Sequence, residues 1–83
     1  MKASSIKYAA AKRIALTTII KQPPDAPLPD EVRFGNDDGA FVIRIRQGEC
    51  LTEKFVSWSV IDTSVESIVH TMKLALEDLA RAQ

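Results

Sequence analysis

The apolar residues near the C-terminus recur with the spacing of an amphipathic helix. When successive residues are placed 100° apart, these positions fall within an arc of about 140°. They are Val65, Ile68, Val69, Met72, Ala75, Leu76, Leu79 and Ala80. Thr63 is a suitable N-cap, and Glu66 three residues later completes a capping box. The pattern therefore predicts a C-terminal helix that starts just after Thr63 and buries one face.

Leu74 is the large apolar residue on the opposite face of this predicted helix. Its neighbours there are polar or charged, and they are Glu66, His70, Lys73, Glu77, Asp78 and Arg81. A single exposed leucine is ordinary on a protein surface. The alternative is a contact with another molecule, and Leu74 is therefore a candidate partner contact.

The segments 31–35 and 40–47 alternate apolar and polar residues, as half-buried strands do. The apolar positions are Val32, Phe34, Phe41, Ile43 and Ile45. Residues 36–39, with the sequence Asn-Asp-Asp-Gly, form a turn cluster between the two segments. A four-residue loop over this cluster would place Phe34 opposite Phe41 in an antiparallel hairpin.

A third strand is expected over 51–60, after a turn that begins with Gly48. Its register has two solutions. A two-residue turn sets Val56 opposite Phe41, whereas a bulge or a three-residue turn brings Phe55 to the inner face instead. The strand is rich in aromatic and β-branched residues in either case.

Residues 4–21 are compatible with two structures. Ser4 or Ser5 can cap a helix, and the alanines at 9–11 favour one. The β-branched residues that follow favour a strand over about 13–21 instead. We prefer the helix, which would be apolar on two sides. One side carries Ile6, Ala9, Ala10, Leu16 and Ile20 around Arg13, and the other carries Tyr8, Ala11, Ala15 and Ile19. Such a helix needs two neighbours, for example its own sheet and a second subunit.

The four prolines all lie within residues 23–30, which predicts a stiff, extended connector. It separates an N-terminal element (1–22) from the sheet and the last helix (31–83). A chain of 83 residues allows one domain, here 1–83. Together the patterns predict a small α+β domain with an N-terminal helix, a three-stranded antiparallel sheet and a C-terminal helix on one sheet face (α-β-β-β-α).

The charges are distributed unevenly, although the formal net charge is zero. Residues 1–24 carry five positive charges and no acid, and the remainder carries six positive against eleven negative charges, a net of −5. The basic segment therefore contacts either nucleic acid or an acidic protein surface, on its own C-terminal helix or on a second subunit. We prefer the protein surface, with Lys7, Lys12 and Arg13 as candidate contacts.

The predicted sheet also presents a second candidate contact surface. Arg33, Arg44 and Arg46 would share the outer face, with Val42 exposed between them. Glu53 opposite Arg44 would form a cross-strand ion pair. Because arginine is enriched at protein interfaces, this face is a candidate for partner binding.

The sequence offers little catalytic chemistry. His70 has no evident partner for acid–base work, Cys50 cannot form an internal disulfide, and Asp37 with Asp38 are best interpreted as turn formers. We predict no catalytic residue, no cofactor and no metal site. Uncharged stretches, such as 14–20, reach at most seven residues, too few to span a bilayer. We therefore expect a cytoplasmic protein without membrane contact.

The predicted order of elements resembles that of double-stranded-RNA-binding domains. Members of that family carry a lysine-rich motif at the start of their second helix. Here residues 62–66 read Asp-Thr-Ser-Val-Glu, which would repel phosphate. The loop between the first two strands is also acidic, at Asp37 and Asp38. We therefore assign no family.

These observations favour a non-enzymatic protein that binds another protein and forms a homodimer. Small, neutral chains with few motifs are common among accessory proteins of phages and mobile elements, some of which inhibit a host protein complex. That comparison is an analogy. The alternative is a small nucleic-acid-binding regulator that uses the basic N-terminal segment.

Overall fold

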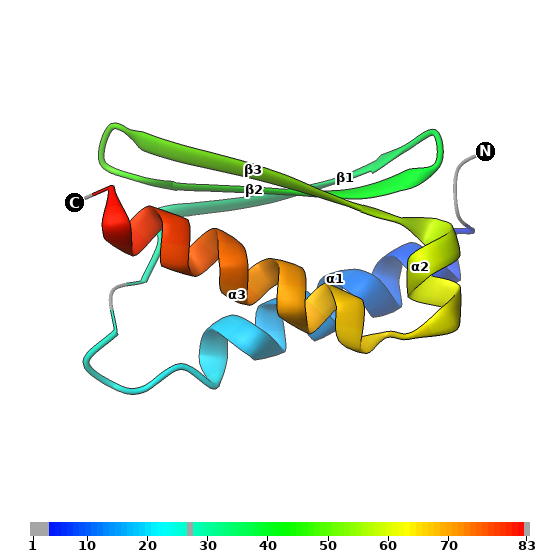
Figure 1. Ribbon diagram of the computed structural model, residues 1–83, viewed down its shortest axis with the longest axis horizontal. Coiled ribbons are helices and arrows are strands. Elements are labelled where there is room, and N and C mark those ends of the chain that lie inside the picture. Colours follow the sequence, from blue (N-terminus) through cyan, green and yellow to red (C-terminus); the bar gives the residue numbers. More distant parts are fainter. Residues whose placement is uncertain (1–3, 27, 83) are drawn as a thin grey trace.

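The computed structural model describes residues 4–26 and 28–82 and confirms the small α+β domain (Figure 1). Its elements are α1 (Ser5–Ile20), β1 (Glu31–Asp37), β2 (Ala40–Gln47), β3 (Cys50–Ser57), α2 (Trp58–Thr63) and α3 (Glu66–Arg81). The strands form one antiparallel sheet in the order β1-β2-β3. Residues 1–3 of the predicted basic element and Pro27 of the predicted connector lie outside the described residues.

α1 forms although β-branched residues crowd its C-terminal half. Ser4 caps its start, because the Oγ of Ser4 accepts a hydrogen bond from the backbone N–H of Lys7 at 3.2 Å. Near the other end, the Oγ1 of Thr18 donates to the carbonyl of Ile14 at 3.0 Å, which satisfies this hydroxyl within the helix. The predicted helix over 4–21 is confirmed, and the strand alternative is wrong.

One of the two apolar sides of α1 packs against the rest of the domain. The inner side consists of Tyr8, Ala11, Ala15 and Ile19, which join the core. The opposite side, called here the exposed side of α1, consists of Ile6, Ala9, Ala10, Arg13, Leu16 and Ile20. Ile6 is 82% exposed and Ile20 is 79% exposed. Within the described chain, α1 therefore packs on one side only, whereas the sequence predicts neighbours on both sides.

The β1–β2 hairpin is tighter than predicted. Its turn consists of Asp38 and Gly39, so that Phe34 pairs with Ile43 and not with Phe41. Gly39 adopts a φ of 85°, which residues with side chains rarely adopt, and this permits the tight turn. The predicted four-residue loop is therefore wrong. The error shifts the pairing by two residues, so the same side chains still face inward.

The β2–β3 pairing follows the first of the two predicted registers. Val56 lies opposite Phe41, and the turn contains two residues, of which Gly48 has a φ of 61°. Glu53 lies opposite Arg44, as predicted. Phe55 consequently belongs to the outer face of the sheet.

The chain leaves the sheet earlier than the predicted strand 51–60 implies. Residues 58–63 form α2, because Ser57 acts as its N-cap and its Oγ accepts a hydrogen bond from the N–H of Ser59 at 3.2 Å. Trp58 is therefore the first residue of a helix and not part of a strand. It is buried, and its Nε1 donates to the Oδ1 of Asn36 at 3.1 Å.

α3 begins two residues later than its predicted start. Thr63 ends α2 and its Oγ1 donates to the carbonyl of Ser59, so it cannot cap the next helix. Val65 occupies the N-cap without a side-chain hydrogen bond, and the predicted capping box is wrong. The buried residues of α3 are Ile68, Met72, Ala75 and Leu79. Val65 and Ala80, which the pattern assigns to the buried face, are exposed.

Among the residues that the structure describes, the helices all lie on one face of the sheet, and the other face has no helix over it (Figure 1). α3 packs on β2 and β3, and α1 lies beside α3 and runs in the same general direction. Phe41 is fully buried where the helices meet the sheet. Among the described residues, no helix is long and apolar enough to cross a membrane.

Candidate functional site

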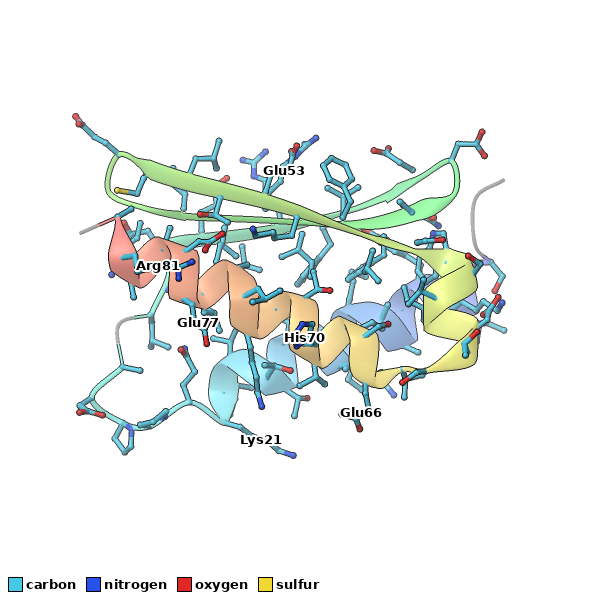
Figure 2. All side chains as sticks on the ribbon, viewed as in Figure 1. Lys21, Glu53, Glu66, His70, Glu77 and Arg81 are labelled. Carbon is cyan, nitrogen blue, oxygen red and sulfur yellow. The ribbon has the colours of Figure 1, made fainter. Side chains whose placement is uncertain are left out.

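The face of the sheet away from the helices, called here the outer sheet face, is open along all three strands. The pairing places on it Glu31, Arg33, Gly35, Asp37, Ala40, Val42, Arg44, Arg46, Leu51, Glu53, Phe55 and Ser57. Figure 2 shows Glu53 projecting from the sheet on the side opposite the helices. Antiparallel sheets commonly leave one face in water, but such a face is then polar. This one is partly apolar.

Leu51 and Phe55 are the exposed apolar side chains of the outer sheet face, at 67% and 57% exposure. Val42 lies on the same face but is only 1% exposed, so the prediction of an exposed Val42 is wrong. Val42 pairs with Gly35 on one side and with Phe55 on the other. A Cβ on Gly35 would meet the Cβ of Val42 at 3.3 Å, so the two residues pack closely. Val42 is therefore a buried residue of the outer sheet face and is not available to a partner.

The three predicted arginines lie on β1 and β2, to one side of Leu51 and Phe55 on the edge strand β3, and each forms an ion pair. Arg44 is paired with Glu53, Arg33 is paired with Glu31, and Arg46 lies 3.3 Å from the same Glu31 carboxylate. These side chains are partly exposed, so the pairs add little to stability. Arg46 lies directly opposite Leu51, and Arg44 lies opposite Glu53, which separates Leu51 from Phe55 along β3.

Two carboxyl groups have lowered pKa values. The hydrogen bond from Arg46, and next the charge of Arg33, lower the pKa of Glu31 below its ordinary 4.5. Hydrogen bonds from Lys54, at 2.6 Å, and from Arg81 lower the pKa of Asp78 below its ordinary 3.8. Both groups favour the ionised form in the folded chain more than in the unfolded chain.

The free energy of unfolding is therefore expected to fall in acid. The contribution of Glu31 and Asp78 is complete above their ordinary pKa values and is lost as the pH falls through the lowered values, because the unfolded chain binds these protons first. Urea unfolding between about pH 5 and pH 3 measures how steeply the free energy of unfolding depends on pH. Asp78→Asn should flatten this dependence, and an unchanged slope in that variant would contradict the assignment.

A groove separates α1 from α3 on the surface of the helical layer. Its volume is about 900 Å³, and half-buried Ile14, Val69 and Leu76 supply much of its apolar lining. Its charged lining residues are Arg13 of α1, Lys21 directly after the end of α1, and Glu66, Lys73 and Glu77 of α3. We call this feature the α1–α3 groove.

Lys7, Lys12 and Arg13, the predicted basic contacts on α1, differ in whether an ion pair neutralises their charge. Lys7 lies 2.7 Å from Asp62 of α2, and the Nζ of Lys12 lies 4.5 Å from the ring centre of Tyr8. Arg13 forms no ion pair with another described residue. Of the three predicted contacts, Lys7 is thus the one whose charge is paired, whereas Lys12 and Arg13 form no ion pair with another described residue.

Leu74 is exposed on α3, as predicted. It does not line the α1–α3 groove, so the structure does not bring it together with the α1 contacts. It is also absent from the outer sheet face, which consists of strand residues. Leu74 is therefore an isolated apolar residue.

The described residues hold little that could perform catalysis. No group of three or more His, Cys, Asp or Glu side chains among them could hold a metal ion. His70 is exposed in the middle of α3 (Figure 2). The Sγ of Cys50 lies 3.7 Å from the carbonyl oxygen of Ala82.

Comparisons of the chain with protein-family models, with curated proteins and with solved structures found no match. The function proposed below therefore rests on the surfaces of this chain. The sequence did not single out Leu51 and Phe55 as surface residues, although the register with the two-residue turn places both on the outer face. It also missed Lys21, Glu66 and Glu77 as groove residues, because their proximity depends on how α1 and α3 pack.

Proposed function

We propose that this chain is a non-enzymatic protein-binding module, and that the outer sheet face binds its partner. The observation that carries the proposal is the exposure of Leu51 and Phe55 on a sheet face without a helix over it. Exposed aromatic and aliphatic side chains with arginines beside them are typical of protein interfaces. The partner is a protein surface with an apolar patch and charges of both signs at its edge.

The charge balance of the outer sheet face favours a protein over nucleic acid. The face carries three arginines and three acids, Glu31, Asp37 and Glu53, so its formal charge is zero. Binding of a phosphate backbone requires an excess of positive charge. The ion pairs leave no such excess here, while their mixed charges suit a partner surface of mixed charge.

The biological role that we propose is that of an accessory or inhibitory protein of a phage or mobile element, acting on a host protein complex in the cytoplasm. A lone Cys50 makes the fold independent of an oxidising compartment. The small size and the lack of catalytic groups among the described residues agree with a role that consists of binding.

A capture experiment with matched variants tests this function. The tagged chain, Leu51→Glu/Phe55→Glu and Ile6→Glu/Ile20→Glu are incubated with host lysate, and bound proteins are identified by mass spectrometry. We expect one host protein to bind the native chain and the α1 variant, and its affinity for the sheet variant to fall roughly thirtyfold or more. A host protein retained equally by the sheet variant would overturn the assignment of this face.

The alternative function is a small nucleic-acid-binding regulator that uses the basic N-terminal segment. Lys12, Arg13 and Lys21 favour it, since none of the three forms an ion pair with another described residue. A gel shift at physiological salt decides between the two functions. We expect no complex with a dissociation constant below about a micromolar, because non-specific binding is typically weaker. A tighter complex that weakens steeply with salt would reverse the ranking.

A further inference from the structure

We infer that the helical layer is a homodimer interface, in which the exposed side of α1 of each chain docks into the α1–α3 groove of a second copy. This inference extends the proposed function, because it leaves both outer sheet faces of the dimer free for the host partner. It rests on the shape of the helical layer, on its charges and on its symmetry.

The first observation is that each chain carries both halves of a contact. The exposed side of α1 presents aliphatic side chains to solvent, with Arg13 as its only charged residue. Beside it lies the groove, with its apolar lining of Ile14, Val69 and Leu76. An apolar helix face and an apolar groove are complementary in the way that helix-in-groove complexes are.

The second observation is the opposite charge of the two sides of the groove. The α1 side carries Arg13 and Lys21, a charge of +2, and the α3 side carries Glu66, Lys73 and Glu77, a net charge of −1. None of these five forms an ion pair with another described residue. A molecule that places cations over α3 and acids over α1 would neutralise both sides.

A second copy supplies these charges in the required order. Because α1 and α3 run in the same general direction, a two-fold axis along the groove places α1 of the partner over α3 without reversing it. Lys21 of one copy then approaches Glu77 of the other, and Arg13 approaches Glu66. The two-fold axis repeats every contact, and the zero net charge of the chain removes repulsion between copies.

The mass in solution is the first test of the dimer. Light scattering at about 10 µM should give twice 9.2 kDa for the native chain. Ile6→Glu/Ile20→Glu should raise the dimer dissociation constant roughly thirtyfold or more, because it places charge in an apolar contact. Both residues are highly exposed, so circular dichroism should show an unchanged fold. Leu51→Glu, on the opposite face, is the matched control and should remain dimeric.

A charge exchange tests the orientation of the two copies. Arg13→Glu/Lys21→Glu and Glu66→Lys/Glu77→Lys should each weaken self-association at least about tenfold, since each places like charges opposite one another. An equimolar mixture of the two variants should restore a dimer, because opposite charges then meet again. The restored dimer should contain one chain of each kind, which native mass spectrometry resolves.

A native chain that stays at 9.2 kDa up to about 200 µM overturns the inference. So does a dimer that Leu51→Glu breaks and the α1 variant does not, which would place the contact between outer sheet faces. A charge exchange without recovery overturns the proposed orientation. The host-binding function is tested independently of the dimer. A monomer that still captures its partner through Leu51 and Phe55 would overturn the dimer inference alone. A dimer that captures no host protein would overturn the proposed function alone.

Discussion

Replacing Phe41 by alanine is expected to lower the free energy of unfolding by about 3–5 kcal/mol. Phe41 is fully buried, and its ring contacts three others: Phe34 at 5.5 Å, Trp58 at 5.6 Å and Tyr8 at 6.0 Å between ring centres. The substitution leaves a cavity where β2 meets α1 and α2, and each lost aromatic pair adds about 0.5–1.5 kcal/mol beyond the lost burial. A domain of this size has a free energy of unfolding of about 4–12 kcal/mol in total, so the variant should be near unfolding at room temperature.

Phe55→Ala is the matched control, because it removes the same side chain from the outer sheet face. Phe55 is more than half exposed, so the loss should stay below about 1 kcal/mol. Both variants should be unfolded in urea at one protein concentration, since dimer formation makes stability depend on concentration. Equal losses in the two variants would contradict the assignment of inner and outer faces.

The alternation of apolar residues predicts the faces of the sheet more reliably than its turns. The hairpin loop predicted over 36–39 is too long by two residues, yet Phe34 and Ile43 still face the core. An error of two residues preserves the side on which every side chain lies. The tight turn depends on the positive φ of Gly39, a property that the Asn-Asp-Asp-Gly sequence permits but does not impose.

The end of the third strand could not be predicted from composition. Residues 58–61 have the β-branched and aromatic character of a strand, but they form α2, because the side chain of Ser57 caps a helix and Trp58 fills the core beside Phe41. Tertiary packing outweighs local β-propensity here. Because α2 forms here, Thr63 belongs to α2 and cannot cap α3, so the predicted capping box of α3 is absent.

The candidate surfaces were predicted in part. The arginines of the outer sheet face and the second apolar side of α1 follow from periodicity alone. The burial of Val42 does not, because it depends on neighbours from two other strands, Gly35 and Phe55. The α1–α3 groove also depends on long-range packing, which brings together residues more than forty positions apart, such as Lys21 and Glu66.

The two apolar sides of α1 lead to a second stability prediction. Ala15 lies on the inner side and is fully buried, as is Ala75 of the neighbouring helix α3. These small residues allow the close packing of α1 on the core. Ala15→Leu is therefore expected to lower the free energy of unfolding by about 1–3 kcal/mol, because the extra methylene groups force the helix away from its neighbours.

Ala9→Leu introduces the same side chain on the exposed side of the same helix. Alanine and leucine are both strong helix formers, so the change in stability should stay within about 0.5 kcal/mol. Urea unfolding of both variants measures the difference between the two sides of α1. At a protein concentration low enough for the chain to be monomeric, a loss at Ala9 as large as that at Ala15 would show that the exposed side is already covered within one chain. This side could then not dock on a second copy.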